Sequence, residues 1–213
     1  MRLPGLIDVH VHTRDPGAPH KEDWESVTAA GLAGGFTQLL GMPNTQPSVV
    51  DEATMAIALD AAAARARCDY GQFIGATGDN AEDAAALAGR AVALKLYLCD
   101  TYGSLLLDKL SMYAPHLERW PSSRPICVHA TGETLGAVIG LAERYHKHLH
   151  VCHLPTWSDL RLVMAARDRG ARVTCEVAPH HLLLSTDDLE RIGPGRCEVR
   201  PRLATPMDCR ELW

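Results

Sequence analysis

The sequence lacks the features by which membrane, secreted and nucleic-acid-binding proteins are usually recognised. No apolar stretch approaches the roughly 18 residues of a membrane-spanning helix. The first five residues run directly into an expected strand, without the apolar core of a signal peptide. No basic run stands out, and the formal net charge of −5 argues against a nucleic-acid-binding surface. We therefore expect an intracellular, cytoplasmic protein that binds neither membrane nor nucleic acid.

Paired cysteines are missing as well. The chain has seven cysteines, an odd number, and no two of them form a C-x-x-C motif. This distribution indicates reduced thiols in a cytosolic protein, most of them small residues of the core, and not a disulfide framework. Cys152 stands apart from the others because it directly precedes His153.

Short apolar runs and alanine-rich segments alternate along the chain. Seven strands are expected, at 5–12, 36–42, 70–76, 91–98, 125–130, 148–154 and 172–177. Six helices are expected between them, at 21–32, 52–67, 81–87, 104–117, 134–146 and 158–169. Several of the strands are continuous apolar runs, which is typical of a parallel sheet that is covered on both faces.

The alternation predicts right-handed βαβ units, and hence either an open doubly wound sheet or a (β/α)8 barrel. Residues 180–213 contain prolines at 194, 201 and 206 and are expected to be irregular. The sequence therefore predicts seven strands and not the eighth strand that a closed barrel requires. We expect residues 1–213 to form a single, incomplete barrel domain, with enough residues for a hydrophobic core.

Polar residues that suit metal binding lie at the ends of the expected strands. His10 and His12 end the first strand two positions apart, so both imidazoles point to the same face. Two neutral imidazoles on one strand can chelate a divalent metal such as Zn²⁺. The alternative is a strand that carries two histidines at this spacing without binding a metal. Functional residues of parallel barrels gather at this rim. Later strands end in further candidate ligands: His129, Cys152, His153 and Glu176.

Lys95 lies within the apolar strand 92–98, which is expected to be buried. A buried ammonium group is destabilising unless it is paired or loses its proton. A deprotonated lysine can react with CO₂ to give a carbamate, which bridges two metal ions as a carboxylate does. The alternatives are a lysine whose ammonium group reaches the surface, or one that pairs with Asp8 or Asp100. The candidate histidine ligands favour the carbamate.

Arg14 and Asn44 are the expected substrate-binding residues. Arg14 follows the histidine pair, where its guanidinium can bind a carboxylate through two hydrogen bonds or pair with Asp15. Asn44 follows the second strand and can instead cap the next turn. The remaining histidines are expected to be structural, with 180 and 181 beyond the last strand and 146, 148 and 150 solvated at the opposite rim.

Several of these segments together resemble the dihydroorotases of the amidohydrolase superfamily. The resemblance covers nearly the whole chain and is strongest to the dihydroorotase domain of the animal multifunctional pyrimidine-synthesis protein. The segments that carry it occur in the family's order: Gly5–Gly17, Met42–Thr45, Leu94–Tyr97, the surroundings of Cys152–His153, and Val177–Leu182.

The resemblance implies a binuclear zinc site in a (β/α)8 barrel that interconverts N-carbamoyl-L-aspartate and L-dihydroorotate in pyrimidine biosynthesis. It implies that His10 and His12 hold one zinc ion and that His129 and His153 hold the other, with carboxylated Lys95 as the bridge. It further implies that Arg14 and Asn44 bind the substrate carboxylate, that Thr101 belongs to a loop closing over the substrate, and that Cys152 and Glu176 can hold an additional zinc. Such a chain is expected to act as a homo-oligomer or as part of a multifunctional pyrimidine-synthesis complex.

Some positions depart from the family's pattern. Asp15 stands where a glutamate is usual, Thr131 where an acidic residue is common, and 154–157 where a basic segment is expected. The family's eighth strand carries an aspartate that is both metal ligand and proton shuttle, and Asp187 and Asp188 come too early to replace it. The 213-residue chain by itself is therefore expected to be inactive or nearly so.

Two other functions are consistent with the sequence. One is a related cyclic amidohydrolase, such as a hydantoinase or an allantoinase. Arg14 and the stretch 42–45 argue against it, because they favour a substrate with a carboxylate. The other is a non-catalytic, dihydroorotase-like scaffold subunit, and the retained histidines and Lys95 argue against that.

Overall fold

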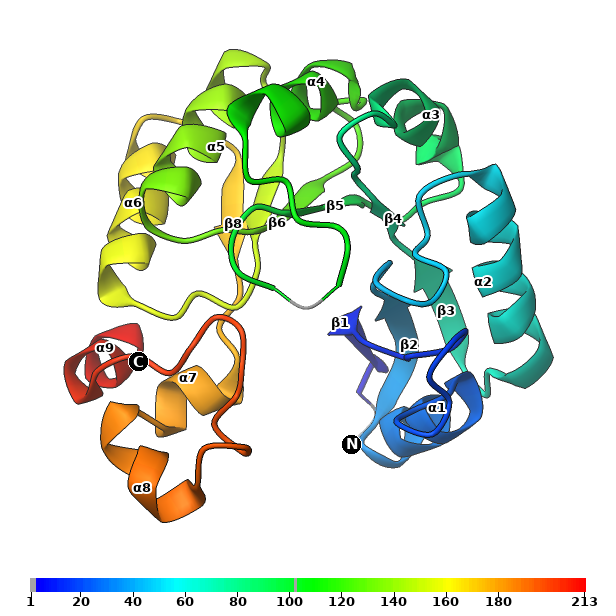
Figure 1. Cartoon of the computed structure of the whole chain (residues 1–213), viewed down its shortest axis with the longest axis horizontal. Coiled ribbons are helices and arrows are strands. Elements are labelled where there is room, and N and C mark those ends of the chain that lie inside the picture. The colour runs from blue at the N-terminus through cyan, green and yellow to red at the C-terminus, as the bar shows by residue number, and fades with distance from the viewer. Residues whose placement is uncertain (1–2, 102) are drawn as a thin grey trace.

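The computed structural model describes residues 3–101 and 103–213. Its strands form a curved parallel array with helices along the outer side (Figure 1). The strands are β1 (Leu6–Val11), β2 (Phe36–Gly41), β3 (Asp69–Gln72), β4 (Ile74–Gly75), β5 (Leu94–Tyr97), β6 (Ile126–His129), β7 (Leu149–Val151) and β8 (Val173–Cys175). The helices between them are α1 (Trp24–Ala33), α2 (Glu52–Arg65), α3 (Ala81–Ala86), the 3-10 helix η1 (Leu87–Gly89), α4 (Leu110–Arg119), α5 (Gly132–Arg144) and α6 (Trp157–Asp168).

The array has seven strand positions, as the sequence predicts, because β3 and β4 are two parts of one strand interrupted at Phe73. Strands β1 to β3 pair in order, and so do β4 to β8. The backbone N–H of Phe73 donates to Gly41 O at 3.0 Å, and that of Val92 donates to Gln72 O at 3.0 Å, which joins the two groups. The strand order follows the chain order throughout. This order is that of a barrel and not that of a doubly wound sheet, in which the order reverses.

Alternation along the strands divides the side chains between two environments. Leu94 and Leu96 of β5 belong to the large core between strands and helices, whereas Lys95 is fully buried among residues of the barrel interior. Helices α2 to α6 complete this core with buried apolar residues. In α5 these are Leu135, Val138, Ile139 and Ala142, at the spacing of an amphipathic helix. The strands are therefore buried on both sides, as their apolar character predicts.

Helix boundaries differ from the predicted ones where capping residues decide them. Asp51 accepts a hydrogen bond from the Thr54 backbone at 2.8 Å, so α2 begins at Glu52 as predicted. Asp23 caps α1 in the same way, and this helix begins at Trp24, later than the predicted residue 21. The predicted helix 104–117 is wrong in its first part, because Leu106 forms a bridge with Tyr97 and α4 begins only at Leu110.

The prediction that residues 180–213 are irregular is also wrong. This segment contains most of α7 (Pro179–Leu183), the 3-10 helix η2 (Thr186–Asp188), α8 (Leu189–Ile192) and α9 (Pro206–Leu212). Pro179 and Pro206 begin helices here, because a backbone N–H at the first helical position has no acceptor within the helix, so proline is tolerated there. Thr205 and Asp208 form the capping box of α9. These short helices lie beside the end of the array that contains β8 (Figure 1).

Within the described residues, β1 and β8 have no partner strand on their outer edges. The apolar side chains of β1 are correspondingly exposed, with Leu6 at 53%, Ile7 at 54% and Val9 at 44%. Unpaired strand edges with apolar side chains are templates for intermolecular pairing. None of the helices formed by the described residues combines the length and the hydrophobicity needed to cross a membrane.

We expect the substitution Ile7→Lys to reduce self-association of the 213-residue chain, because a charged side chain on a free edge opposes strand pairing. Light scattering across a concentration series measures this. Ile57→Lys is the matched control, since Ile57 is 45% exposed but lies on α2, away from any strand edge. An equal reduction in both variants would show that general apolar exposure, and not the free edge, causes the association.

Candidate metal centre

A cavity of about 590 Å³ opens at the carboxyl ends of the strands. Its walls come from β1, from the ends of β5 to β8 and from the segments 177–180 and 198–200. Six of the residues that the sequence singles out line it together: His10, His12, His129, His153, Arg14 and Asn44. Thr101 and Glu176 line it too, whereas Tyr102, the next residue of the same loop, lies outside the described residues.

The four imidazoles form a contiguous cluster. The ring centroids of His10 and His12 are 5.4 Å apart, those of His10 and His153 are 5.3 Å apart, and those of His129 and His153 are 4.7 Å apart. Nδ1 of His129 faces Nε2 of His153 at 3.2 Å. Strands β1, β6 and β7 thus bring together histidines that are distant in the sequence, as expected for the ends of parallel strands.

Hydrogen bonds determine which ring nitrogens face the cluster. His12 Nδ1 donates to the Asn44 side-chain oxygen at 2.7 Å, which leaves its Nε2 as the lone-pair donor. His129 Nε2 donates to the backbone oxygen of Asp100 at 3.0 Å, which leaves Nδ1 on the side of His153. The buried Nδ1 of His153 has no hydrogen-bond partner within the part of the chain that the structure describes. Lone pairs oriented in this way are suited to binding a cation.

Burial keeps three of the imidazoles neutral. It lowers the pKa of His12 to about 3, with the charges of His10 and Arg14 acting in the same direction. Burial and the charge of Lys95 lower the pKa of His129 to about 4 and that of His153 to about 2. His10 differs, because its hydrogen bonds with Cys152 and Glu176 outweigh the effect of burial and raise its pKa. Neutral imidazoles are the form that binds metals.

Lys95 lies close enough to the four imidazoles for its charge to act against their protonation. Its side chain is 0% exposed, and its Nζ donates to Cys152 Sγ at 2.8 Å. The ammonium group therefore neither reaches the surface nor pairs with Asp8 or Asp100. Burial favours loss of its proton, as predicted, but Cys152 outweighs burial and raises the pKa of Lys95. The same pairing, with a hydrogen bond from Cys127, holds the pKa of the Cys152 thiol well below its usual range against the effect of burial.

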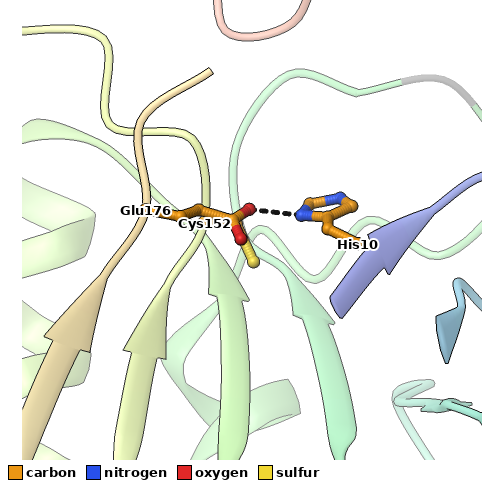
Figure 2. Close-up of side chains that lie close together, drawn as sticks. All are labelled: His10, Cys152 and Glu176. Carbon is orange, nitrogen blue, oxygen red and sulfur yellow. Dashed lines mark hydrogen bonds and ion pairs between the residues drawn. The ribbon is translucent and has the colours of Figure 1, made fainter. Parts of the chain in front are cut away.

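A second group of donors lies between β1 and β8. One donor atom each from His10, Cys152 and Glu176 lies within 4.8 Å of the others. Figure 2 shows Glu176 and Cys152 on one side and His10 on the other, with the hydrogen bond between Glu176 and His10 Nδ1. The backbone N–H of His153 also donates to Glu176 Oε1 at 3.3 Å. Burial opposes ionisation of Glu176, but its hydrogen bonds with His10 and His150 hold the pKa below the usual range.

Two cavity residues adopt the left-handed backbone conformation. Arg14 has φ 58° and His153 has φ 36°. Residues other than glycine adopt this conformation at a cost of about 1–3 kcal/mol, and such residues are concentrated at functional sites. Arg14 does not pair with Asp15, which instead contacts Arg65 at 3.0 Å. Asn44 contacts His12 and lines the cavity, so it does more than cap a turn.

Sequence reasoning missed Arg200 as a cavity residue. Its side chain is only 13% exposed and forms ion pairs with Asp100 at 2.7 Å and with Glu198 at 2.6 Å. Arg200 lies in a segment that was expected to be irregular, and no hydrophobic periodicity around it indicates a role in the site. Only the tertiary fold brings residues 198–200 to the cavity. His180 also lines the cavity, whereas His181 is buried and contacts the Pro201 backbone oxygen at 3.2 Å.

Two further expectations are wrong. His150 is not solvated at the opposite rim, because it lies inside the barrel with its Nε2 3.2 Å from Glu176 Oε2. Most cysteines are not core residues, since only Cys127, Cys152 and Cys197 are buried. Cys152, which the sequence set apart from the core cysteines, is one of the buried three because it points into the barrel interior.

Residues 1–99 match the family model described as "Dihydro-orotase-like". Over its full length the chain is 49% identical to the multifunctional protein pyr1-3 of Dictyostelium discoideum and 47% identical to the multifunctional protein CAD of Squalus acanthias. The chain covers 10% of each of these two proteins. It therefore spans about a tenth of the length of the curated relatives it matches first.

Solved structures agree with the parallel barrel fold described above. The inactive dihydroorotase-like domain of the Chaetomium thermophilum CAD-like multifunctional protein superposes with a TM-score of 0.83 at 29% identity, covering 99% of this chain and 60% of that one. The L-hydantoinase of Arthrobacter aurescens superposes with a TM-score of 0.87 at 22% identity, covering 99% and 54%. The described strands therefore form part of the same parallel barrel fold as these two proteins.

The lowered histidine pKa values predict a dependence of stability on pH in the metal-free protein. Below the ordinary value of 6.5, the unfolded chain binds more protons at His12, His129 and His153 than the folded chain does. The free energy of unfolding is therefore expected to fall as the pH drops from 7 to 5, by up to about 1.4 kcal/mol per pH unit below 6.5 for each imidazole. His10, whose pKa is raised, offsets part of this loss.

Urea unfolding in the presence of a chelator at several pH values measures this dependence. The variant His12→Asn lacks one of the three imidazoles and should show a smaller fall. A free energy of unfolding that stays constant or rises between pH 7 and pH 5 would contradict the assignment of neutral histidines.

Proposed function

We propose that the chain belongs to the dihydroorotase-like family, because residues 1–99 match its family model. We further propose that it forms the metal-binding part of a zinc-dependent cyclic amidohydrolase that interconverts N-carbamoyl-L-aspartate and L-dihydroorotate in pyrimidine biosynthesis. The observation that carries this proposal is the convergence of four imidazoles at one cavity that also contains two arginines, with Lys95 buried nearby. Residues 1–213 are proposed to be one incomplete barrel domain.

The donor set suits two zinc ions. His10 and His12 would hold one ion, and His129 and His153 the other, since neutral imidazole nitrogens are common zinc ligands. The unpartnered Nδ1 of His153 and the facing nitrogens of His129 and His153 support this assignment. Bound zinc would polarise the carbonyl group of the substrate and would allow a water molecule to ionise near neutral pH.

Lys95 is proposed to carry a carbamate that bridges the two ions. Carbamate formation joins the Nζ of the neutral amine to the carbon of CO₂ and releases one proton. In the metal-free protein Cys152 keeps Lys95 in its ammonium form. We therefore propose that modification of Lys95 accompanies zinc binding, when the contact with Cys152 is broken. An additional zinc at Cys152 and Glu176 is supported less directly, because Glu176 is already engaged by His10 and Cys152 by Lys95.

The substrate has two carboxylates in its open form, and the cavity offers groups for both. Arg14 presents a guanidinium beside the histidines, and Asn44 is held in place by His12. Arg200 is a second guanidinium in the cavity lining, and it would exchange an ion pair with Asp100 or Glu198 for the substrate carboxylate. Thr101 directly follows Asp100 and also lines the cavity. Charge-assisted hydrogen bonds of this kind orient the ring amide toward the metal centre.

Ring opening also needs a proton for the leaving nitrogen. The carboxylates that line the cavity are engaged elsewhere: Asp8 accepts from the His10 backbone N–H at 3.0 Å, Glu198 contacts Arg200, and Glu176 contacts His10. We therefore propose that the proton-shuttle aspartate comes from outside these 213 residues and that the 213-residue piece alone has little or no activity. The whole enzyme is proposed to act in the cytoplasm, as a homo-oligomer or within a multifunctional protein.

Two alternatives remain distinct from this proposal. A hydantoinase-like or allantoinase-like enzyme shares the barrel and the metal ligands but acts on uncharged rings, which the two arginines do not favour. The second alternative is a non-catalytic scaffold, and the Chaetomium relative is an example of a dihydroorotase-like domain that is named as inactive. The complete set of histidines around the cavity argues against that alternative.

We expect the zinc-stripped chain to take up about two zinc ions when it is reloaded with bicarbonate present, because two imidazole pairs and a bridging carbamate define two positions. Elemental analysis measures the stoichiometry, and intact-mass spectrometry detects the added CO₂ on Lys95. A third equivalent would indicate the additional position at Cys152 and Glu176.

His129→Asn is expected to lose at least one zinc equivalent, whereas His20→Asn, in an exposed loop, should keep both. Lys95→Ala should lose the bridge and with it part of the zinc. A wild-type chain that binds no zinc would refute the proposed enzyme and favour the scaffold.

Binding of the substrate separates the remaining alternatives. The zinc-loaded chain is expected to bind N-carbamoyl-L-aspartate, and Arg14→Gln should weaken this binding by roughly tenfold to hundredfold, because charged hydrogen bonds contribute about 1.5–3 kcal/mol. Calorimetric titration measures the affinity. Arg172→Gln, an exposed arginine at the opposite rim, is the control. Tighter binding of allantoin or hydantoin than of the dicarboxylate would favour the related amidohydrolases.

A further inference from the structure

A row of polar side chains runs along the inner faces of β7 and β8 toward the metal-binding cluster. His150 lies on β7 and His148 directly precedes that strand, while Thr174 lies on β8 and Glu176 directly follows it. Nε2 of His148 lies 3.3 Å from Thr174 Oγ1, and that hydroxyl lies 2.9 Å from His150 Nδ1. His150 Nε2 then lies 3.2 Å from Glu176 Oε2. These side chains line a second cavity, of about 200 Å³, within the barrel.

The hydrogen-bonding capacity of each group gives this row a single direction. The ionised Glu176 carboxylate only accepts, so His10 Nδ1 and His150 Nε2 must both donate to it. A neutral His150 that donates through Nε2 has its lone pair on Nδ1, so the Thr174 hydroxyl donates there. The oxygen of that hydroxyl accepts from His148 Nε2. Each member therefore determines where the next one carries its proton.

The row ends at His10, across the open side of the barrel. Glu176 follows β8 and His10 lies on β1, and within the described residues no backbone pairing joins these two strands. Figure 2 shows the second ring nitrogen of His10 on the far side of the ring from Glu176. The carboxylate is held by three donors, namely His10, His150 and the backbone N–H of His153. A carboxylate held in this way has one orientation.

We propose that His150 and Thr174 are positioning residues for His10: they hold Glu176 so that its carboxylate keeps the His10 proton on Nδ1 and leaves Nε2 free to bind metal. This inference rests on the proposed function, in which His10 is a zinc ligand. Partners that orient a ligating histidine contribute about 10–100-fold to metal affinity. The row extends that control by two further residues along the barrel interior.

Substitutions at His150 test the central link. His150→Leu removes the donor to Glu176 and is expected to lower zinc affinity about tenfold or more, as measured by competition with a chelator of known affinity. His150→Gln places an amide donor near the position of Nε2 and should restore most of the affinity. Nitrogen-15 NMR of the imidazoles in the metal-free protein gives a second readout. The wild type should show His10 protonated on Nδ1, and His150→Leu should show a mixture of the two tautomers.

Thr174 provides an independent pair of variants that keep the shape of the strand. Thr174→Val removes the hydroxyl and should shift the His10 tautomer and the zinc affinity in the same direction as His150→Leu, whereas Thr174→Ser should retain both. Thr37→Val is the matched control, since Thr37 is exposed on β2. A purely structural role would lower the stability of the Thr174 variants without changing the tautomer.

The inference and the proposed function fail in different ways. Unchanged His10 tautomer and unchanged zinc affinity in both His150→Leu and Thr174→Val would overturn the positioning role while the wild type still binds zinc. Absence of zinc binding by the wild type would overturn the proposed function instead. In that case the tautomer measurement, made without metal, still decides whether the row controls His10. If His150→Leu does not fold, the Thr174 pair alone decides the question.

Discussion

The cavity depends on one property of parallel strands, which is that all of their carboxyl ends lie at the same rim while alternate residues point inward. In β5 this places Leu94 and Leu96 against the helices and Lys95 inside the barrel. In β6 it places Ile126 and Val128 outside, and His129 at the cavity. A strand can therefore contribute to the hydrophobic core and to the site at the same time, because the two faces have different neighbours.

Burial determines the chemical state of the site. In the interior, a charged imidazole loses its hydration, so His12, His129 and His153 are neutral and offer lone pairs. The same environment brings the ammonium of Lys95 into contact with Cys152, because a buried charge requires a partner. A bound cation would change both conditions at once. The donor groups of the proposed metal centre are thus already assembled, with Lys95 paired to Cys152.

Much of the site was predictable because it follows strand ends. The spacing of His10 and His12, the apolar surroundings of Lys95 and the positions of His129 and His153 identify them as one set before any coordinates are known. The resemblance to the dihydroorotases adds the proposed roles that spacing alone leaves open. Arg200 and His150 were not predictable, because their surroundings in the sequence have no pattern that relates them to the cavity. Their contacts with Asp100 and Glu176 exist only between distant segments.

The sequence by itself determined the seven strands, the order of strands and helices, and the residues at each carboxyl end, because these depend on local periodicity and on side-chain chemistry. Tertiary structure decided the partners. It placed Lys95 beside Cys152 and not beside an aspartate, and it turned His150 into the interior. It also made helices of a proline-containing segment that local reasoning had considered irregular. Such pairings depend on the distance between residues far apart in the chain, which only the tertiary packing of the array defines.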